Sequence, residues 1–193
     1  MMGNKYSASE FLKNIYSLIM TKIYIPQARL IRRPTYIRGV KSLDGCKNLT
    51  MGRFCRFDLD GEKKTLYIGS NCEIGDMTHI VAHNSVEIGE NVLIASKCFI
   101  SDTNHGNYSG DNPDSPETKP NKRRLTVGKT KIGNNVWIGE NAVILSGANI
   151  GDGCIIGANT IVSKDISSAS IVVGTNKIIK QWNDREKKWI SVL

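Results

Sequence analysis

The sequence of 193 residues has little of several features that would place it in other classes of protein. No apolar run reaches the roughly 18 residues that cross a membrane. No basic start is followed by an apolar core and a small-residue cleavage site, so we expect no signal peptide. The five cysteines form no CxxC pair. This argues against a disulfide framework or a zinc knuckle and favours a reducing, cytoplasmic compartment.

The short motifs of common hydrolases and nucleotide-binding enzymes are also absent, because no GxSxG, HExxH or P-loop occurs. Histidine is scarce, with only His79, His83 and His105. The net charge of +8 suggests anionic partners. Without interleaved exposed aromatic residues, however, the basic residues do not predict a nucleic-acid surface, and we expect no nucleic-acid partner.

Glycine is plentiful, and seven of the 18 glycines follow an Ile that recurs every six residues. Each six-residue unit predicts a short strand and a turn, and stacked units bury a core that one unit alone cannot bury. The sequence therefore predicts a mainly β fold, a parallel β-helix over residues 41–176. Cys72, Cys98 and Cys154 fall where a small interior residue is needed. The aliphatic positions of the repeat are Ile68, Ile74, Ile80, Ile88, Ile94, Ile100, Ile132, Ile138, Ile144, Ile150, Ile156 and Val162.

The two flanks differ from the repeat. Residues 1–40 form a basic segment with a predicted helix over 7–25, and residues 177–193 are predicted to form a C-terminal helix that covers the end of the β-helix. Packing on its own protein is the ordinary role of the first helix. The alternative is attachment to an anionic membrane, at the inner face of the cell membrane, helped by nearby arginines. The apolar residues that recur at helical spacing are, in the first predicted helix, Phe11, Leu12, Ile15, Leu18, Ile19 and Ile23, and in the C-terminal one, Ile178, Ile179, Trp182 and Trp189.

The repeat is interrupted by a loop of residues 101–126, rich in Gly, Pro, Asn and Asp. Long loops on a rigid scaffold usually carry function. His105 lies at the root of this loop, and imidazole has an unperturbed pKa suited to proton transfer near neutral pH. We interpret His105 as a candidate general base; the alternative is a solvated loop histidine. His79 projects outward before Ile80, and we expect it to line an acceptor cleft with Asp76.

The segments Ile132–Gly139, Gly147–Gly151 and Gly157–Ile166 resemble the hexapeptide-repeat acyltransferases. The resemblance covers roughly residues 65–180 and is strongest to the galactoside/maltose acetyltransferase type and to bacterial O-antigen or capsular polysaccharide O-acetyltransferases. It implies a left-handed β-helix, a homotrimer with active sites between subunits, and no metal. It also implies acetyl-CoA as co-substrate, a sugar or glycan acceptor, and His105 as the general base of direct transfer.

The same resemblance assigns residues to the acetyl-CoA path. Asn104, Asp102 or a backbone carbonyl is expected to fix the tautomer of His105. Two departures from the family pattern affect the nucleotide end of the site: Glu140 stands where Ser is frequent, and the segment from Gly174 to Lys177 lacks the usual proline. The residues assigned to cofactor binding are Trp137, Ala158, Ser163, Lys164, Lys177 and Lys180.

Two other activities fit the sequence less well. An N-acetyltransferase of an amino-sugar nucleotide needs the same base, and the sequence does not distinguish it from an O-acetyltransferase. A γ-carbonic-anhydrase-like metalloenzyme needs three histidines, with the close pair after the longer gap. Here the close pair, His79 and His83, comes first.

Overall fold

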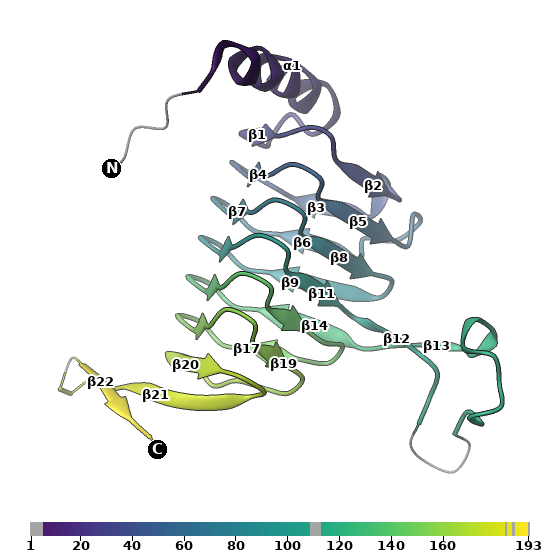
Figure 1. Cartoon of the computed structure of the whole chain (residues 1–193), viewed down its shortest axis with the longest axis vertical. Helices are drawn as coiled ribbons and strands as arrows, with labels where there is room; N and C mark the ends of the chain where they lie inside the picture. Colours follow the sequence, from purple (N-terminus) through teal and green to yellow (C-terminus); the bar gives the residue numbers. More distant parts are fainter. Residues whose placement is uncertain (1–5, 109–112, 184, 187, 193) are drawn as a thin grey trace.

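The computed structural model describes residues 6–108, 113–183, 185–186 and 188–192. Figure 1 shows a solenoid of stacked coils with one helix across its N-terminal end, an arm projecting from its side, and two antiparallel strands at its C-terminal end. Parallel pairing stacks the coils into three sheets, called here sheets A, B and C. The predicted parallel β-helix is confirmed.

The strands and helices have the following bounds. Sheet A contains β1 (Leu30–Ile31), β4 (Thr50–Met51), β7 (Glu73–Ile74), β10 (Leu93–Ile94), β15 (Trp137–Ile138), β18 (Ile155–Ile156), β20 (Ser170–Val173), β21 (Lys177–Asn183) and β22 (Lys188–Ser191). Sheet B contains β2 (Tyr36–Arg38), β5 (Arg56–Leu59), β8 (His79–Ala82), β11 (Phe99–Ser101), β16 (Val143–Ile144) and β19 (Ile161–Val162). Sheet C contains β3 (Leu43–Gly45), β6 (Leu66–Ile68), β9 (Ser85–Ile88), β14 (Lys129–Ile132) and β17 (Asn149–Ile150). The helices are α1 (Ala8–Tyr24) and the short 3-10 helices η1 (Val40–Ser42) and η2 (Pro120–Lys122).

The six-residue period sets the interior of the coils. All twelve aliphatic residues of the repeat are buried, and they lie in register from coil to coil, as Ile74, Ile94 and Ile138 do. The corners of the coils need tight backbone turns. Asn71 and Asn91 adopt positive φ angles of 60° and 55° at one corner, where the side-chain amide of Asn71 donates to that of Asn91 at 3.2 Å.

The cysteines are all interior residues. All five are buried and unpaired, including Cys46 and Cys55, which the repeat did not explain. Burial raises the pKa of Cys46 to about 12 and those of Cys55 and Cys98 to about 11. These thiols therefore remain protonated near neutral pH and contribute small apolar volume rather than nucleophilic chemistry.

The N-terminal helix closes one end of the solenoid in an unusual orientation. α1 begins with a capping box between Ser7 and Glu10. Its buried side chains are Ser17 and Thr21, whose hydroxyls accept backbone N–H groups of Arg33 at 3.1 Å and Ile31 at 2.9 Å. The predicted apolar residues lie on the exposed surface instead. No described helix is long and apolar enough to cross a membrane.

Two boundaries of the sequence prediction are corrected by the strand pairing. β1 and β2 already pair with β4 and β5, so the β-helix begins before residue 41. The predicted helix over 177–193 is wrong, because β21 pairs antiparallel with β20 and β22 pairs antiparallel with β21. The unpaired backbone groups of β20 at the sheet edge offer hydrogen bonds that a helix would leave unused.

The interruption of the repeat forms the arm. It leaves the solenoid after β11 and returns at β14 through the antiparallel strands β12 (Thr103–His105) and β13 (Leu125–Val127), which pair with each other. In Figure 1 the arm extends away from the coils. The predicted loop over 101–126 is therefore confirmed in position, and its root is an ordered hairpin stem.

Candidate active site

A groove of about 500 Å³ lies where the outward face of sheet B meets the root of the arm. Strands β2, β5, β8 and β11 supply its floor, and β12 and β13 supply one side. All three histidines of the chain line it. The lining residues are Arg38, Arg56, Asp58, Leu59, His79, Val81, His83, Phe99, Ser101, Thr103, His105 and Leu125.

Asp58 organises the charged part of this groove. Its carboxylate lies 2.6 Å from the Arg56 guanidinium, 3.0 Å from Nε2 of His79 and 3.5 Å from the Arg38 guanidinium. Parallel pairing of β2, β5 and β8 brings these residues from successive coils to one face. The Phe99 ring supports the imidazole of His79 from the next coil, with 5.3 Å between ring centroids.

The charge of Asp58 fixes the tautomer of His79. Burial acts to raise the pKa of the Asp58 carboxyl, but hydrogen bonds from Arg56 and His79 and the charges of Arg56 and Arg38 outweigh it and lower the pKa below its usual value. The ionised carboxylate only accepts hydrogen bonds, so Nε2 of His79 donates and carries a proton. Asp58 was not among the residues predicted from the sequence, which placed Asp76 beside His79 in the acceptor cleft.

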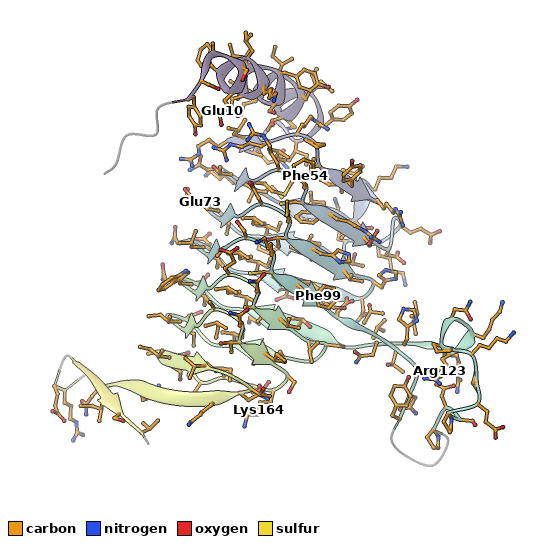
Figure 2. The ribbon with its side chains drawn as sticks, viewed as in Figure 1. Glu10, Phe54, Glu73, Phe99, Arg123 and Lys164 are labelled. Carbon is orange, nitrogen blue, oxygen red and sulfur yellow. The ribbon has the colours of Figure 1, made fainter. Side chains whose placement is uncertain are left out.

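His105 lies on β12 at the root of the arm, and its position is held through its backbone. It pairs with Leu125 on β13, and the Tyr108 hydroxyl donates to its carbonyl. The Arg123 guanidinium donates to the Tyr108 hydroxyl at 2.8 Å and to the carbonyl of Thr118 at 3.0 Å. Figure 2 labels Arg123 in the arm, away from the coils.

Glycine is required beside His105. Gly106 has a φ of +102°, and a Cβ there would lie 2.7 Å from the Tyr108 hydroxyl. An L side chain at this position is disfavoured by the backbone and would displace Tyr108. The conformation of the root therefore depends on this glycine.

His105 borders two hollows. One is the groove on sheet B; the other, of about 530 Å³, is lined by Asn104, Gly106, Asn107, Tyr108 and Thr126 together with His105. The imidazole of His105 is exposed and makes no hydrogen bond within the described part of the chain, whereas that of His79 is engaged by Asp58. His105 therefore borders both hollows, which is the placement that a general base acting between two substrates requires.

Asp102 has a structural role at this root. Its buried carboxylate accepts backbone N–H groups of His83, Asn84 and Ser85 at 3.0, 2.7 and 2.8 Å, and the Thr103 hydroxyl at 2.6 Å. These bonds join the arm to the corner between β8 and β9. Asp102 is therefore engaged away from the imidazole of His105.

Asp76 does not line the groove. Its carboxylate accepts the backbone N–H of Arg53 at 2.7 Å, at the corner between sheets A and B. The expectation that Asp76 lines this groove together with His79 is therefore wrong. The side chain of Asn104 lines the second hollow.

The residues assigned to the acetyl-CoA path lie on other parts of the solenoid. Trp137 is half exposed on sheet A, between Leu93 and Ile155 in register. Ser163 is joined to Asn176 by hydrogen bonds of 2.8 and 2.9 Å, close to the start of β21. Ala158, Lys164 and Lys177 are exposed, and Figure 2 labels Lys164 near the C-terminal end. The backbone of Lys180 lies in β21, and its side chain is outside the described set.

No group of three or more His, Cys, Asp or Glu side chains that could hold a metal ion occurs among the described residues.

Comparison with known proteins agrees with this architecture. A family model described as bacterial transferase hexapeptide (six repeats) matches residues 129–164. An Escherichia coli K-12 protein, provisionally named as the lipopolysaccharide biosynthesis O-acetyl transferase WbbJ, is 35% identical over 190 residues, covering 97% of this chain and 96% of that one. The chain belongs to the hexapeptide-repeat acyltransferases. As a member of this family, it is an enzyme that transfers an acyl group.

Two further relatives extend the comparison. Galactoside O-acetyltransferase of Escherichia coli K-12 is 38% identical over 125 residues, which cover 64% of this chain and 58% of that protein. A galactoside acetyltransferase structure with coenzyme A has a TM-score of 0.50 at 35% identity, over 69% of this chain and 68% of that one. A mutant of AntD, an N-acyltransferase from Bacillus cereus, shares the fold with a TM-score of 0.67 at 22% identity, over 98% of this chain and 91% of that one.

Proposed function

We propose that this protein is an acetyl-CoA-dependent O-acetyltransferase that modifies a sugar hydroxyl in bacterial surface polysaccharide biosynthesis. The observation that carries the proposal is the position of His105, on a rigid hairpin root between two hollows. The match over nearly the whole chain to a protein named for lipopolysaccharide O-acetylation supports the substrate class. The galactoside acetyltransferase structure with coenzyme A supports the donor.

In the proposed mechanism, His105 acts as general base. Its imidazole accepts the proton of the acceptor hydroxyl as that oxygen attacks the thioester carbonyl carbon. The tetrahedral intermediate collapses with cleavage of the carbon–sulfur bond, and the imidazolium returns the proton to the departing thiolate. No covalent enzyme intermediate is needed, which agrees with the burial of all five thiols.

The groove on sheet B is the proposed acceptor site. Arg38, Arg56, Asp58 and His79 offer charged donors and an acceptor suited to sugar hydroxyls and a nearby anionic group. We propose that Trp137, Ala158, Ser163, Lys164, Lys177 and Lys180 contact the donor. Since Trp137 lies on sheet A and His105 beside sheet B, a complete site is best explained by a homotrimer in which neighbouring subunits supply different parts.

Acetyl transfer to a panel of bacterial sugars, read by mass spectrometry, tests this proposal. We expect His105→Ala to lower kcat by about 10²- to 10⁴-fold while acetyl-CoA binding persists. His79→Ala is the matched control, because it removes the other well-placed imidazole; it should mainly raise the acceptor KM. Loss of kcat in His79→Ala with retained activity in His105→Ala would assign the base to the Asp58–His79 pair instead. Transfer to amino sugars alone would identify an N-acetyltransferase.

A further inference from the structure

The face of α1 that points away from the solenoid is apolar. Ser17 and Thr21 face the first coil, and six apolar side chains on the other side are between 41% and 66% exposed. Soluble proteins ordinarily bury such a stripe and expose the polar one. The six residues, called here the apolar face of α1, are Phe11, Leu12, Ile15, Leu18, Ile19 and Ile23.

Positive charge is concentrated in the same part of the chain. Residues 1–43 contain eight Lys or Arg and one Glu, a net of +7 out of the +8 of the whole chain. The remaining 150 residues are therefore nearly neutral. A basic segment next to an apolar helix face complements a surface that is apolar inside and anionic outside.

The junction of α1 with the first coil adds basic side chains just below the helix. A groove of about 660 Å³ is lined there by Lys13, Arg33 and Arg53, among others. The one carboxylate in it, Glu10, is engaged in the capping box with Ser7. The groove is thus suited to anionic headgroups beneath a helix that lies among acyl chains.

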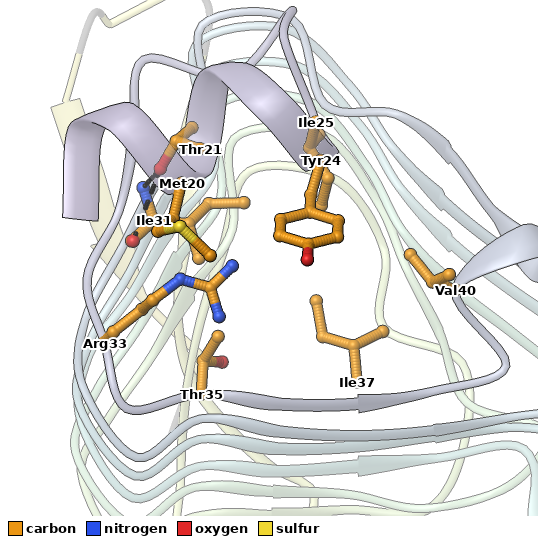
Figure 3. A pocket seen from close by; sticks show the side chains of 9 residues that line it. All are labelled: Met20, Thr21, Tyr24, Ile25, Ile31, Arg33, Thr35, Ile37 and Val40. Carbon is orange, nitrogen blue, oxygen red and sulfur yellow. Dashed lines mark hydrogen bonds between the residues drawn. The ribbon is translucent and has the colours of Figure 1, made fainter. Parts of the chain in front are cut away.

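Arg33 also faces a second, mostly apolar cavity of about 300 Å³ under the helix. Figure 3 shows its guanidinium pointing into that space, next to Tyr24 and opposite Ile37. The Arg33 guanidinium carbon lies 5.5 Å from the centre of the Tyr24 ring. Its Nε is buried without a hydrogen-bond partner in the described part of the chain. An anionic group entering this cavity would meet the positive charge of the guanidinium.

We propose that the N-terminal end of the solenoid docks on an anionic membrane surface, with the apolar face of α1 lying among the acyl chains. α1 lies across the end of the solenoid in Figure 1, so this face points along the long axis, away from the coils. An oligomer of solenoids packed side by side would therefore leave the apolar face of α1 uncovered. The docking inference does not depend on the catalytic proposal.

Docking would orient the acceptor groove. Arg38 lies on β2 in the first coil, and His105 comes shortly after β11. These two strands are three inter-strand spacings apart in sheet B, or roughly 14 Å. The charged end of the groove would therefore face the membrane and His105 would lie farther from it. This consequence, unlike the docking itself, rests on the proposed function.

Flotation of the full chain with vesicles tests the docking. The vesicles contain phosphatidylcholine alone or equal parts of phosphatidylcholine and phosphatidylglycerol. We expect at least tenfold more binding to the anionic vesicles at about 0.1 M salt, with a several-fold loss at about 0.5 M. The variant Ile19→Gln/Ile23→Gln should bind at least tenfold less. The matched control Tyr67→Gln/Met77→Gln, with similarly exposed side chains on the flank of the solenoid, should bind as the wild type does.

A second variant, in which basic residues are neutralised, tests the docking even if Ile19→Gln/Ile23→Gln folds poorly. Lys13→Gln/Arg53→Gln should lose the preference for anionic vesicles, whereas Lys129→Gln/Lys131→Gln on sheet C should keep it. Equal binding of wild type to both vesicles, or no binding, overturns the proposal. The proposal is also overturned if the wild type binds no vesicles and Ile19→Gln/Ile23→Gln has a lower mass than the wild type in sedimentation equilibrium, because a second copy of the chain would then cover this face.

Discussion

The outward face of sheet B has two halves that share one register but differ in chemistry. One row of outward side chains runs along its strands in the order Tyr36, Arg56, His79, Phe99, Val143 and Ile161. Before the arm leaves the solenoid the row is mostly polar and charged, and Asp58 lies beside it. After the arm returns, the row is apolar.

This division follows the position of the arm and not the fold of the coils. Pairing, spacing and interior packing are the same on both sides of it. The polar half lines the groove with His105. The apolar half, with Val143 half-buried and Ile161 39% exposed, has the composition of a subunit contact. On the proposed function, the first half of this face serves the acceptor, and we expect the second half to contact a neighbouring subunit.

The largest effect is expected from a charge in the apolar half. Ile161→Glu should raise the dissociation constant of the oligomer by at least about 100-fold, because burying an unpaired carboxylate at a contact costs several kcal/mol. Analytical ultracentrifugation over a dilution series measures this. Activity should fall in parallel if neighbouring subunits complete the site.

Tyr67→Glu is the control for that change. Tyr67 is 45% exposed in the outward row of sheet C, where the neighbouring residues are polar. We expect it to leave the oligomer intact. If Ile161→Glu also assembles normally, the apolar half is not a subunit contact and the comparison between the two halves fails.

A smaller effect is expected in the polar half. Asp58→Asn removes the charge that orients Arg56 and His79 and should raise the acceptor KM about tenfold, or about 1.4 kcal/mol in binding, with little change in kcat. Steady-state kinetics with varied acceptor separate the two parameters. Asp60→Asn, in the exposed turn after β5, is the control and should behave as the wild type. An unchanged KM in Asp58→Asn would exclude the cluster from acceptor binding.

The coils and the arm were predictable because both depend on local sequence. A six-residue period needs only the spacing of Ile, Gly and small residues, and the arm is where that period stops. The tail was mispredicted because its short apolar runs fit either a strand or a helix, and the edge of β20 decides between them. The local sequence pattern does not indicate which segment pairs with the edge of a sheet, because that pairing depends on tertiary contacts.

The groove was only partly predictable for a related reason. His79 and Asp58 are 21 residues apart, and the irregular turn at residues 60–64 hides their common register. The apolar pattern of α1 predicted the helix correctly, but ordinary amphipathic packing implies the opposite orientation. The hydroxyls of Ser17 and Thr21 bind backbone N–H groups at the open end of the first coil, which apolar side chains would leave unsatisfied.

The smallest expected effect is a pH dependence of stability that belongs to the polar half alone. The native pKa of Asp58 is lower than its usual value near 3.8, so its carboxylate stabilises the fold at neutral pH and this contribution is lost as the pH falls through the native pKa. Asp58→Asn should therefore cost about 1 kcal/mol of unfolding free energy at pH 7 and almost nothing once the pH has fallen below the native pKa of Asp58. Urea unfolding monitored by circular dichroism at several pH values measures the difference, with Asp60→Asn as the control. A cost that stays constant into the acid range would mean that Asp58 acts through packing and not through its charge, and the electrostatic contrast between the two halves of sheet B would then be lost.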